Sequence, residues 1–109
     1  MGTPAVIPVT VAVLPTETTL CTLDVRTTDV VTVQLNNLDA SQQLRGFIYR
    51  RANASMPWTI STLADLGTIE PLTSGCVDID CQGNSDIQVT GYMSGAGGNV
   101  TVCVRDKPR

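Results

Sequence analysis

Apolar and polar residues alternate with a period of two along most of this chain. Successive side chains of a β-strand point to opposite faces, so the alternation predicts strands that bury one face and expose the other. Short connections containing Gly, Asn or Ser separate these runs, and no long run has a helical period. The predicted strands are residues 5–14, 18–26, 29–36, 44–51, 58–60, 76–81, 86–93 and 99–105.

These short strands, within a chain of 109 residues, predict an all-β fold. We expect a two-sheet antiparallel β-sandwich, either jelly-roll-like or immunoglobulin-like, because strand count and alternation are common to both topologies. A chain of this length forms one core, which predicts a single domain over residues 1–109. Residues 1–8 and 105–109 are predicted to be extended arms, and residues 62–66 a single helical turn that Gly67 ends.

Side-chain parity within the strands predicts the core. In the strand at residues 29–36, the odd-numbered apolar residues share one face and Thr, Gln and Asn share the other. The same rule selects one apolar set in each of the last two strands. The predicted core positions are Val31, Val33, Leu35, Ile87, Val89, Met93, Val100, Val102 and Val104.

The strand at residues 44–51 is apolar on both faces. A strand of this kind is covered on both sides, so we expect loops or a partner to cover the second face. The two apolar sets are Leu44 with Ile48 and Phe47 with Tyr49.

The N-terminal apolar run at residues 5–14 is also predicted to be a strand. No basic segment of the kind found in signal peptides precedes it, and it is too short to cross a bilayer. We therefore expect no membrane partner. Pro8 lacks a backbone N–H and suits an edge position or a bulge. The residues predicted to share one face are Ile7, Val9, Val11 and Val13.

The composition narrows the chemistry that we expect. Hydrophobic residues make up 42% of the chain but aromatic residues only 4%, which predicts an aliphatic core. The net charge of −3 lacks the clustered excess of Lys and Arg that nucleic acid binding requires, so no nucleic acid partner is expected. The chain has no histidine and its carboxylates are scattered. We therefore predict no catalytic, metal-binding or cofactor-binding residues and no enzymatic activity.

The cysteines Cys21, Cys76, Cys81 and Cys103 form no C-x-x-C pair and have no histidine to complete a zinc site. Parity places Cys21 and Cys81 on inward faces and the other two on outward faces. If disulfides form, the preferred pairs are therefore Cys21–Cys81 and Cys76–Cys103. A bridge from Cys76 to Cys81 is disfavoured because an extended strand separates them. Four unpaired thiols remain the alternative.

The order of motifs in the C-terminal two thirds resembles a known family. The run Val30–Leu35 is followed by LRGFIYRR, WTIS, GCVDIDC and a final predicted hairpin, DIQVTGYMSGAGGNVTVCV. Over Thr28 to Arg105 this arrangement resembles the small β-sandwich proteins that decorate or cement bacteriophage capsids, and also β-sandwich modules of phage tails and fibres. The four cysteines depart from the pattern of the cement proteins.

The resemblance implies a structural virion protein, assembled in the host cytoplasm, that binds the outside of a phage capsid. It would stabilise the shell by bridging subunits of the major capsid protein, typically as a homotrimer. For Phe47 and Trp58 we expect filling of the core in preference to an interface role. The interface candidates from strand faces and termini are Ile7, Val9, Phe47, Tyr49, Trp58, Tyr92, Arg105, Lys107 and Arg109.

Two alternatives remain open. The first is a carbohydrate- or receptor-binding β-sandwich module of a phage tail or a secreted protein, which would show an exposed aromatic platform and bind glycans as a monomer. The second is a small secreted inhibitor held by disulfides, which the lack of a signal-peptide pattern disfavours. A cement protein, by contrast, is expected to form trimers and attach to capsids.

Overall fold

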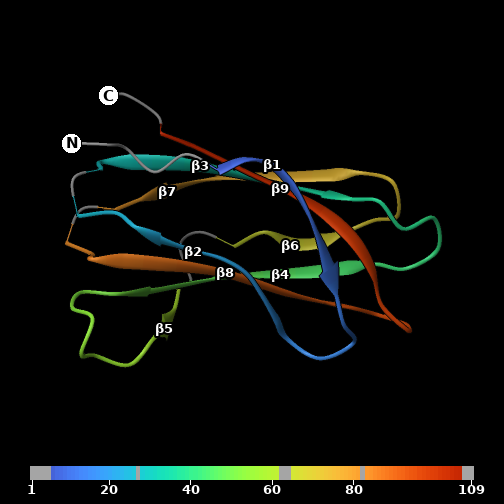
Figure 1. Ribbon diagram of the computed structural model, residues 1–109, viewed down its shortest axis with the longest axis horizontal. Helices are drawn as coiled ribbons and strands as arrows, with labels where there is room; N and C mark the ends of the chain where they lie inside the picture. The colour runs from blue at the N-terminus through green and yellow to red at the C-terminus, as the bar shows by residue number, and fades with distance from the viewer. Residues whose placement is uncertain (1–5, 27, 62–64, 82, 107–109) are drawn as a thin grey trace.

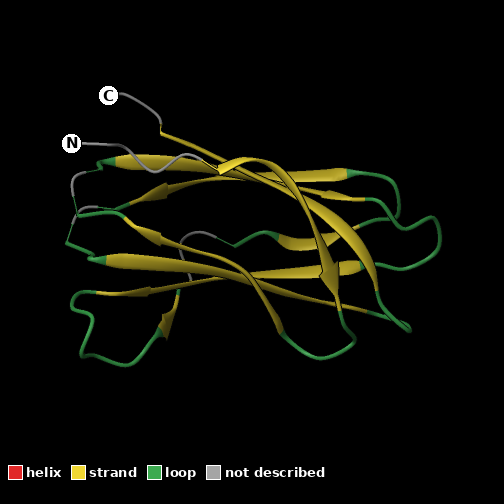
Figure 2. Ribbon diagram, in the orientation of Figure 1, coloured by secondary structure: helices red, strands yellow, loops and turns green. Residues whose placement is uncertain are grey.

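The computed structural model describes residues 6–26, 28–61, 65–81 and 83–106. These residues form two antiparallel sheets packed face to face and contain no helix (Figures 1 and 2). The prediction of an all-β two-sheet sandwich is confirmed. The strands are β1 (Val6–Val13), β2 (Thr18–Asp24), β3 (Val30–Asn37), β4 (Leu44–Arg51), β5 (Thr59–Ile60), β6 (Gly67–Ile69), β7 (Ser74–Asp80), β8 (Asp86–Met93) and β9 (Gly98–Asp106).

The strand order identifies the topology. One sheet has the order β1-β9-β3-β7, and the other has the order β2-β8-β4-β5, with β6 also paired to β4. The pairs are nested, because β1 joins β9, β2 joins β8, β3 joins β7, and β4 joins β5 and β6. The chain is thus one long antiparallel hairpin, rolled so that successive pairs lie in alternate sheets. This arrangement is the jelly roll, which settles the choice between the two predicted topologies.

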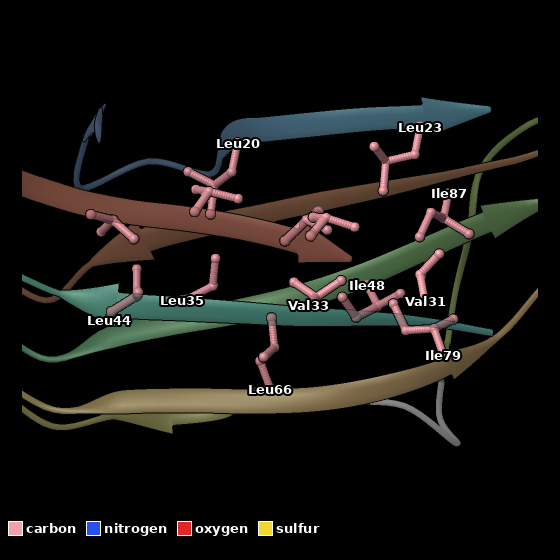
Figure 3. Packing of buried hydrophobic residues seen from close by; sticks show 14 of the residues in the cluster. Leu20, Leu23, Val31, Val33, Leu35, Leu44, Ile48, Leu66, Ile79 and Ile87 are labelled. Carbon is pink, nitrogen blue, oxygen red and sulfur yellow. The ribbon is translucent and has the colours of Figure 1, made fainter. Parts of the chain in front are cut away.

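Aliphatic side chains fill the space between the sheets (Figure 3). In β3 the buried residues share one parity, and Val31, Val33 and Leu35 are completely buried. In β2 the buried residues Leu20 and Leu23 differ in parity, because the register of this strand shifts between Thr19 and Cys21. The predicted core positions are all buried, which confirms that set. Residues of β1, β2, β4, β6 and β7, together with Val25, Leu66 and Cys81 from the connections, complete the cluster.

Some connections differ from the prediction. Gly67–Ile69 forms β6, which alternation cannot identify in so few residues. Asp65 and Leu66 of the predicted helical turn have no helical structure, and residues 62–64 lie outside the described residues. The predicted hairpin of β8 and β9 is wrong, since these strands belong to different sheets. Alternation identifies the buried face of a strand but not the sheet that the strand joins.

The described parts of both predicted arms belong to the first sheet. β1 begins at Val6 and pairs with β9, while β9 continues to Asp106 and pairs there with β3. The pairing of β1 shifts between Val6 and Val9, and β1 is a sheet edge. This confirms that Pro8 occupies an edge with an irregular register. Residues 6–8 and 105–106 are thus extended strand residues of the first sheet, and the rest of both predicted arms, residues 1–5 and 107–109, lies outside the described residues.

Candidate interaction surface

The outer face of the second sheet carries a cluster of large side chains. β4 buries its even-numbered residues as far as Ile48. Its odd-numbered residues consequently face outward, away from the first sheet. β8 adds Tyr92, which lies opposite Arg45 in the ladder. The outward residues of β4 are Arg45, Phe47, Tyr49 and Arg51.

All four aromatic residues of the chain belong to this face. The Phe47 ring stacks on Tyr92 with centroids 6.0 Å apart, and its centroid lies 6.5 Å from that of Tyr49. Aromatic pairs favour offset or tilted contacts at such separations. Trp58 immediately precedes β5, whose Ile60 pairs with Tyr49. The chain thus places no aromatic ring in its core and gathers its rings on one outer surface.

Two arginines cover rings of this cluster. The guanidinium carbon of Arg45 lies 4.3 Å from the centroid of Phe47, and that of Arg51 lies 4.1 Å from the centroid of Trp58. At these distances the cation is attracted to the negative face of the ring. We call Arg45, Phe47, Tyr49, Arg51, Trp58 and Tyr92 together the aromatic face.

Carboxylates hold both guanidinium groups in place. Arg45 donates to the two carboxylate oxygens of Asp65 at 2.9 and 3.1 Å, and also to the carbonyl of Gly46. Hydrogen bonding to Arg45 lowers the pKa of Asp65 below its ordinary value. Arg51 donates to Asp86 at 3.0 Å. Each arginine is thus fixed between a ring and a carboxylate.

Glu17, in the connection from β1 to β2, forms hydrogen bonds with residues of two strands at the same surface. The Thr90 hydroxyl donates to Glu17 Oε2 at 2.5 Å, which satisfies a side chain that is only 3% exposed. A hydrogen bond to the Glu17 carboxylate also raises the pKa of the Tyr49 phenol above its ordinary value. One acidic residue therefore ties this connection to β8 and β4.

Replacing Glu17 by glutamine is expected to lower the pKa of Tyr49, because the hydrogen bond from the phenol to a carboxylate is lost and the charge that opposes ionisation is removed. In the wild-type protein the raised pKa contributes stability below about pH 10, the ordinary tyrosine value, and this contribution is lost as the pH rises through the folded-state pKa. The E17Q variant should consequently lose less stability at alkaline pH. Absorbance titration of Y92F and of E17Q/Y92F, in which Tyr49 is the sole tyrosine, measures the shift. An equal pKa in both would contradict the contact.

The expectation that Phe47 and Trp58 fill the core is wrong. Both side chains are half-buried on the outer surface of the second sheet. The nested pairing turns the apolar faces of the strands toward each other. Aliphatic side chains completely fill the space between the two sheets. The interface candidates Phe47, Tyr49, Trp58 and Tyr92 are therefore gathered into one cluster.

The remaining interface candidates do not join the aromatic face. Val9 is 44% exposed on β1, and Arg105 is exposed on β9, so both belong to the first sheet. The side chain of Ile7 and the residues Lys107 and Arg109 lie outside what the structure describes.

Sequence reasoning missed Arg45, Arg51 and Glu17 as parts of this surface. For the two arginines a signal was present, since residues 45, 47, 49 and 51 of LRGFIYRR share one parity. For Glu17 no local signal exists, because its partners Thr90 and Tyr49 come from distant strands.

All four cysteines are free thiols. Cys76 on β7 and Cys103 on β9 both pair with Gln34 of β3, which separates them. Two strand spacings put their Cα atoms about 10 Å apart, beyond the roughly 7 Å that a disulfide spans. The predicted pair Cys76–Cys103 is therefore wrong. Cys21 and Cys81 face the core as predicted, but Cys21 lies on β2 of the second sheet and Cys81 directly follows β7 of the first, and both are likewise unbonded.

We expect the four thiols to react at different rates. Burial raises the pKa of Cys21 and of Cys81 to about 11, so on the order of one in a thousand of these thiols is ionised at pH 8. Cys76 is exposed and should react first with a disulfide reagent such as dithionitrobenzoate. Stopped-flow labelling of the wild type and of C76S tests this. A fast phase that survives in C76S would contradict the assignment.

A polar pocket of about 620 Å³ lies where the connections after β2, β4 and β7 meet. Its charged groups already bond one another or their neighbours. Arg26 donates to Asp24 at 2.6 Å, and Asp86 accepts from Arg51 and from the Ser85 hydroxyl. This pocket therefore offers few unsatisfied polar groups to a ligand.

Over residues 6–26, 28–61, 65–81 and 83–106 the structure contains no group of three or more His, Cys, Asp or Glu side chains arranged to hold a metal ion. The same residues include no helix that is long and apolar enough to cross a membrane. In comparisons with family models, curated proteins and solved structures, the chain matches none.

Proposed function

We propose that this protein is a non-enzymatic structural component of a phage virion. It binds the capsid exterior after assembly in the host cytoplasm, and it stabilises the shell by bridging subunits of the major capsid protein. The resemblance of the motifs over Thr28 to Arg105 supports a capsid as the binding partner. The aromatic face supports docking onto a protein. That cluster of rings and arginines on an outer sheet face is the observation that carries the proposal.

The residue types of the aromatic face are those of protein interfaces. Trp, Tyr and Arg are enriched among the residues that contribute most binding energy in protein–protein complexes. Five of the six residues of the aromatic face are of these types. Ring stacking and carboxylate contacts already restrict their side chains, so docking would cost less side-chain entropy.

The contacts of the arginines favour a protein ligand over a sugar. Sugar rings stack on bare aromatic faces, but Phe47 and Trp58 each have a guanidinium over the ring. A protein partner can use the ring edges and the guanidinium donors together, for instance through a carboxylate or a backbone carbonyl. The carbohydrate-binding alternative consequently has weaker support than capsid binding.

Co-sedimentation with candidate phage capsids tests the proposed function. The purified protein is expected to pellet with shells and to raise the temperature at which they open. Protein that stays in the supernatant with every shell, and that binds immobilised glycans instead, would contradict capsid binding. Self-association belongs to the proposal, since the resemblance implies a homotrimer on the shell.

A further inference from the structure

The two arginines of the aromatic face are held in different ways. Arg45 donates to Asp65 through both Nη1 and Nη2, and its Nη1 also donates to the carbonyl of Gly46. Arg51 donates to Asp86 through Nε, at 3.0 Å. The terminal fork of Arg45, formed by its two Nη groups, thus already binds a carboxylate. The terminal fork of Arg51 takes no part in its ion pair.

The Nη1 and Nη2 groups of Arg51 are open to solvent. Over residues 6–26, 28–61, 65–81 and 83–106, the polar and ring contacts of the Arg51 side chain are the bond to Asp86 and the stack on Trp58. Within the same residues, the one buried side-chain nitrogen or oxygen that lacks a hydrogen-bond partner is Thr28 Oγ1. The two Nη groups are therefore not buried, and their N–H donors are available to another molecule.

The position of Arg51 is fixed before any partner binds. Arg51 and Asp86 lie directly opposite each other in the β4–β8 ladder, so their side chains share the outer face. Asp86 is held in turn by the hydroxyl of Ser85 at 2.9 Å. The Trp58 ring, whose centroid lies 4.1 Å from the guanidinium carbon, covers one flat side of the guanidinium. Binding a partner through the Nη groups would consequently cost little side-chain entropy.

Exposed apolar side chains belong to the segment that covers Arg51. Ile60 pairs with Tyr49 in the β4–β5 ladder and shares its outward face. Ile60 and Met56, which lie two residues after and two residues before Trp58, are both exposed. A protein docked over this segment would displace water from apolar surface. Loss of that water lowers the local dielectric constant, which strengthens a hydrogen bond between charged groups.

We propose that the Nη1 and Nη2 groups of Arg51 bind one carboxylate of the capsid subunit, from an Asp or Glu side chain. This inference rests on the proposed function and specifies the chemistry of the partner. The two oxygens of a carboxylate match the paired donors of a guanidinium, whereas a backbone carbonyl offers one oxygen. Asp65, Asp86 and Glu17 offset the charge of the two arginines, so the aromatic face as a whole is not basic. The open fork therefore selects a single carboxylate and not a broadly acidic surface.

Co-sedimentation of R51K with shells that bind the wild type tests the role of the fork. Lysine keeps the positive charge but removes the planar pair of donors. We expect R51K to bind about tenfold or more weakly, the loss typical of a hydrogen bond between charged groups. R26K is the matched control, because Arg26 also bonds a carboxylate, that of Asp24, but lies outside the aromatic face. It should bind like the wild type, and equal binding by R51K and R26K would overturn the inference.

Amidation of the shells tests the partner group and does not depend on the folding of R51K. Carbodiimide with methylamine converts accessible Asp and Glu side chains into neutral amides, and electron microscopy confirms that the treated shells are intact. Treated shells should bind the wild type and R26K about tenfold or more weakly than untreated shells. R51K, which already lacks the fork, should bind both kinds of shell alike. An equal fold-loss for all three proteins, or no loss for the wild type, would overturn the carboxylate contact.

The two proposals fail in different ways. Wild-type protein that pellets with no shell would contradict capsid binding, and the carboxylate contact with it. Wild-type binding that neither R51K nor amidation weakens would leave capsid binding standing and would remove Arg51 as the group that receives a carboxylate.

Discussion

Replacing Asn37 by alanine is expected to lower the free energy of unfolding by at least about 2 kcal/mol. Asn37 is the last residue of β3 and is completely buried. Its Nδ2 donates to the carbonyl of Gln42 at 2.8 Å and lies 3.3 and 3.4 Å from the carbonyls of Ile69 and Glu70. Its Oδ1 accepts the amide of Asp39 at 3.0 Å. Alanine would leave these loop groups without partners in a space closed to water.

Asn36 provides the matched control for this prediction. It has the same side chain but lies on the outer face, where its Oδ1 accepts the Ser74 hydroxyl at 3.1 Å. Water can replace that bond, so N36A should cost no more than about 1 kcal/mol. Urea denaturation of both variants measures the difference. Equal losses would show that the loop contacts of Asn37 contribute nothing beyond an ordinary surface hydrogen bond.

Asn37 also shows which features of the structure a local sequence pattern can predict. It shares the parity of Val33 and Leu35, so alternation already directs it inward. The predicted strand nevertheless ends at Asn36, because an Asn-Asn pair is typical of a loop. The carbonyls that satisfy Asn37 come from the connection after β3 and from the end of β6. Those segments meet only through the nested pairing, which no local pattern contains.

The same distinction applies to the fold. The core could be predicted because Val31, Ile87 and Val100 each belong to a strand whose own alternation identifies its buried face. The jelly-roll order could not be predicted, since it depends on which strands pair. β8 and β9 follow each other in sequence and still join opposite sheets. Adjacent strands separated by a Gly-rich connection are compatible with a hairpin and with a crossing between sheets alike.

The candidate site was predicted residue by residue but not as a surface. Phe47, Tyr49, Trp58 and Tyr92 are large aromatic residues, which is sufficient to name them as interface candidates. Their proximity depends on the pairing of β4 with β8 and with β5. The low aromatic content was interpreted correctly as an aliphatic core, yet the expected core position of Phe47 and Trp58 contradicts that same interpretation.

Replacing Tyr92 by alanine is expected to weaken attachment to capsids by about 30-fold or more, the loss typical of an aromatic hot-spot residue. Tyr92 stacks on Phe47, which also contacts Arg45 and Tyr49, and Tyr92 is itself 37% exposed. Its ring is available to a partner, and its removal opens no cavity between the sheets. The stability of Y92A should therefore change by less than about 1 kcal/mol. Co-sedimentation over a range of shell concentrations gives the change in affinity.

Leu38 supplies the control, because it is a comparably exposed apolar side chain, 42% exposed, that lies outside the aromatic face. L38A removes apolar surface without touching the stacked rings and should bind capsids like the wild type. Equal weakening in Y92A and L38A would indicate nonspecific adhesion to the shell. Wild-type affinity in Y92A, with the fold intact, would exclude the aromatic face as the contact surface. Capsid attachment that persists in Y92A would then come from another surface, such as the outer face of the first sheet, which bears Arg105.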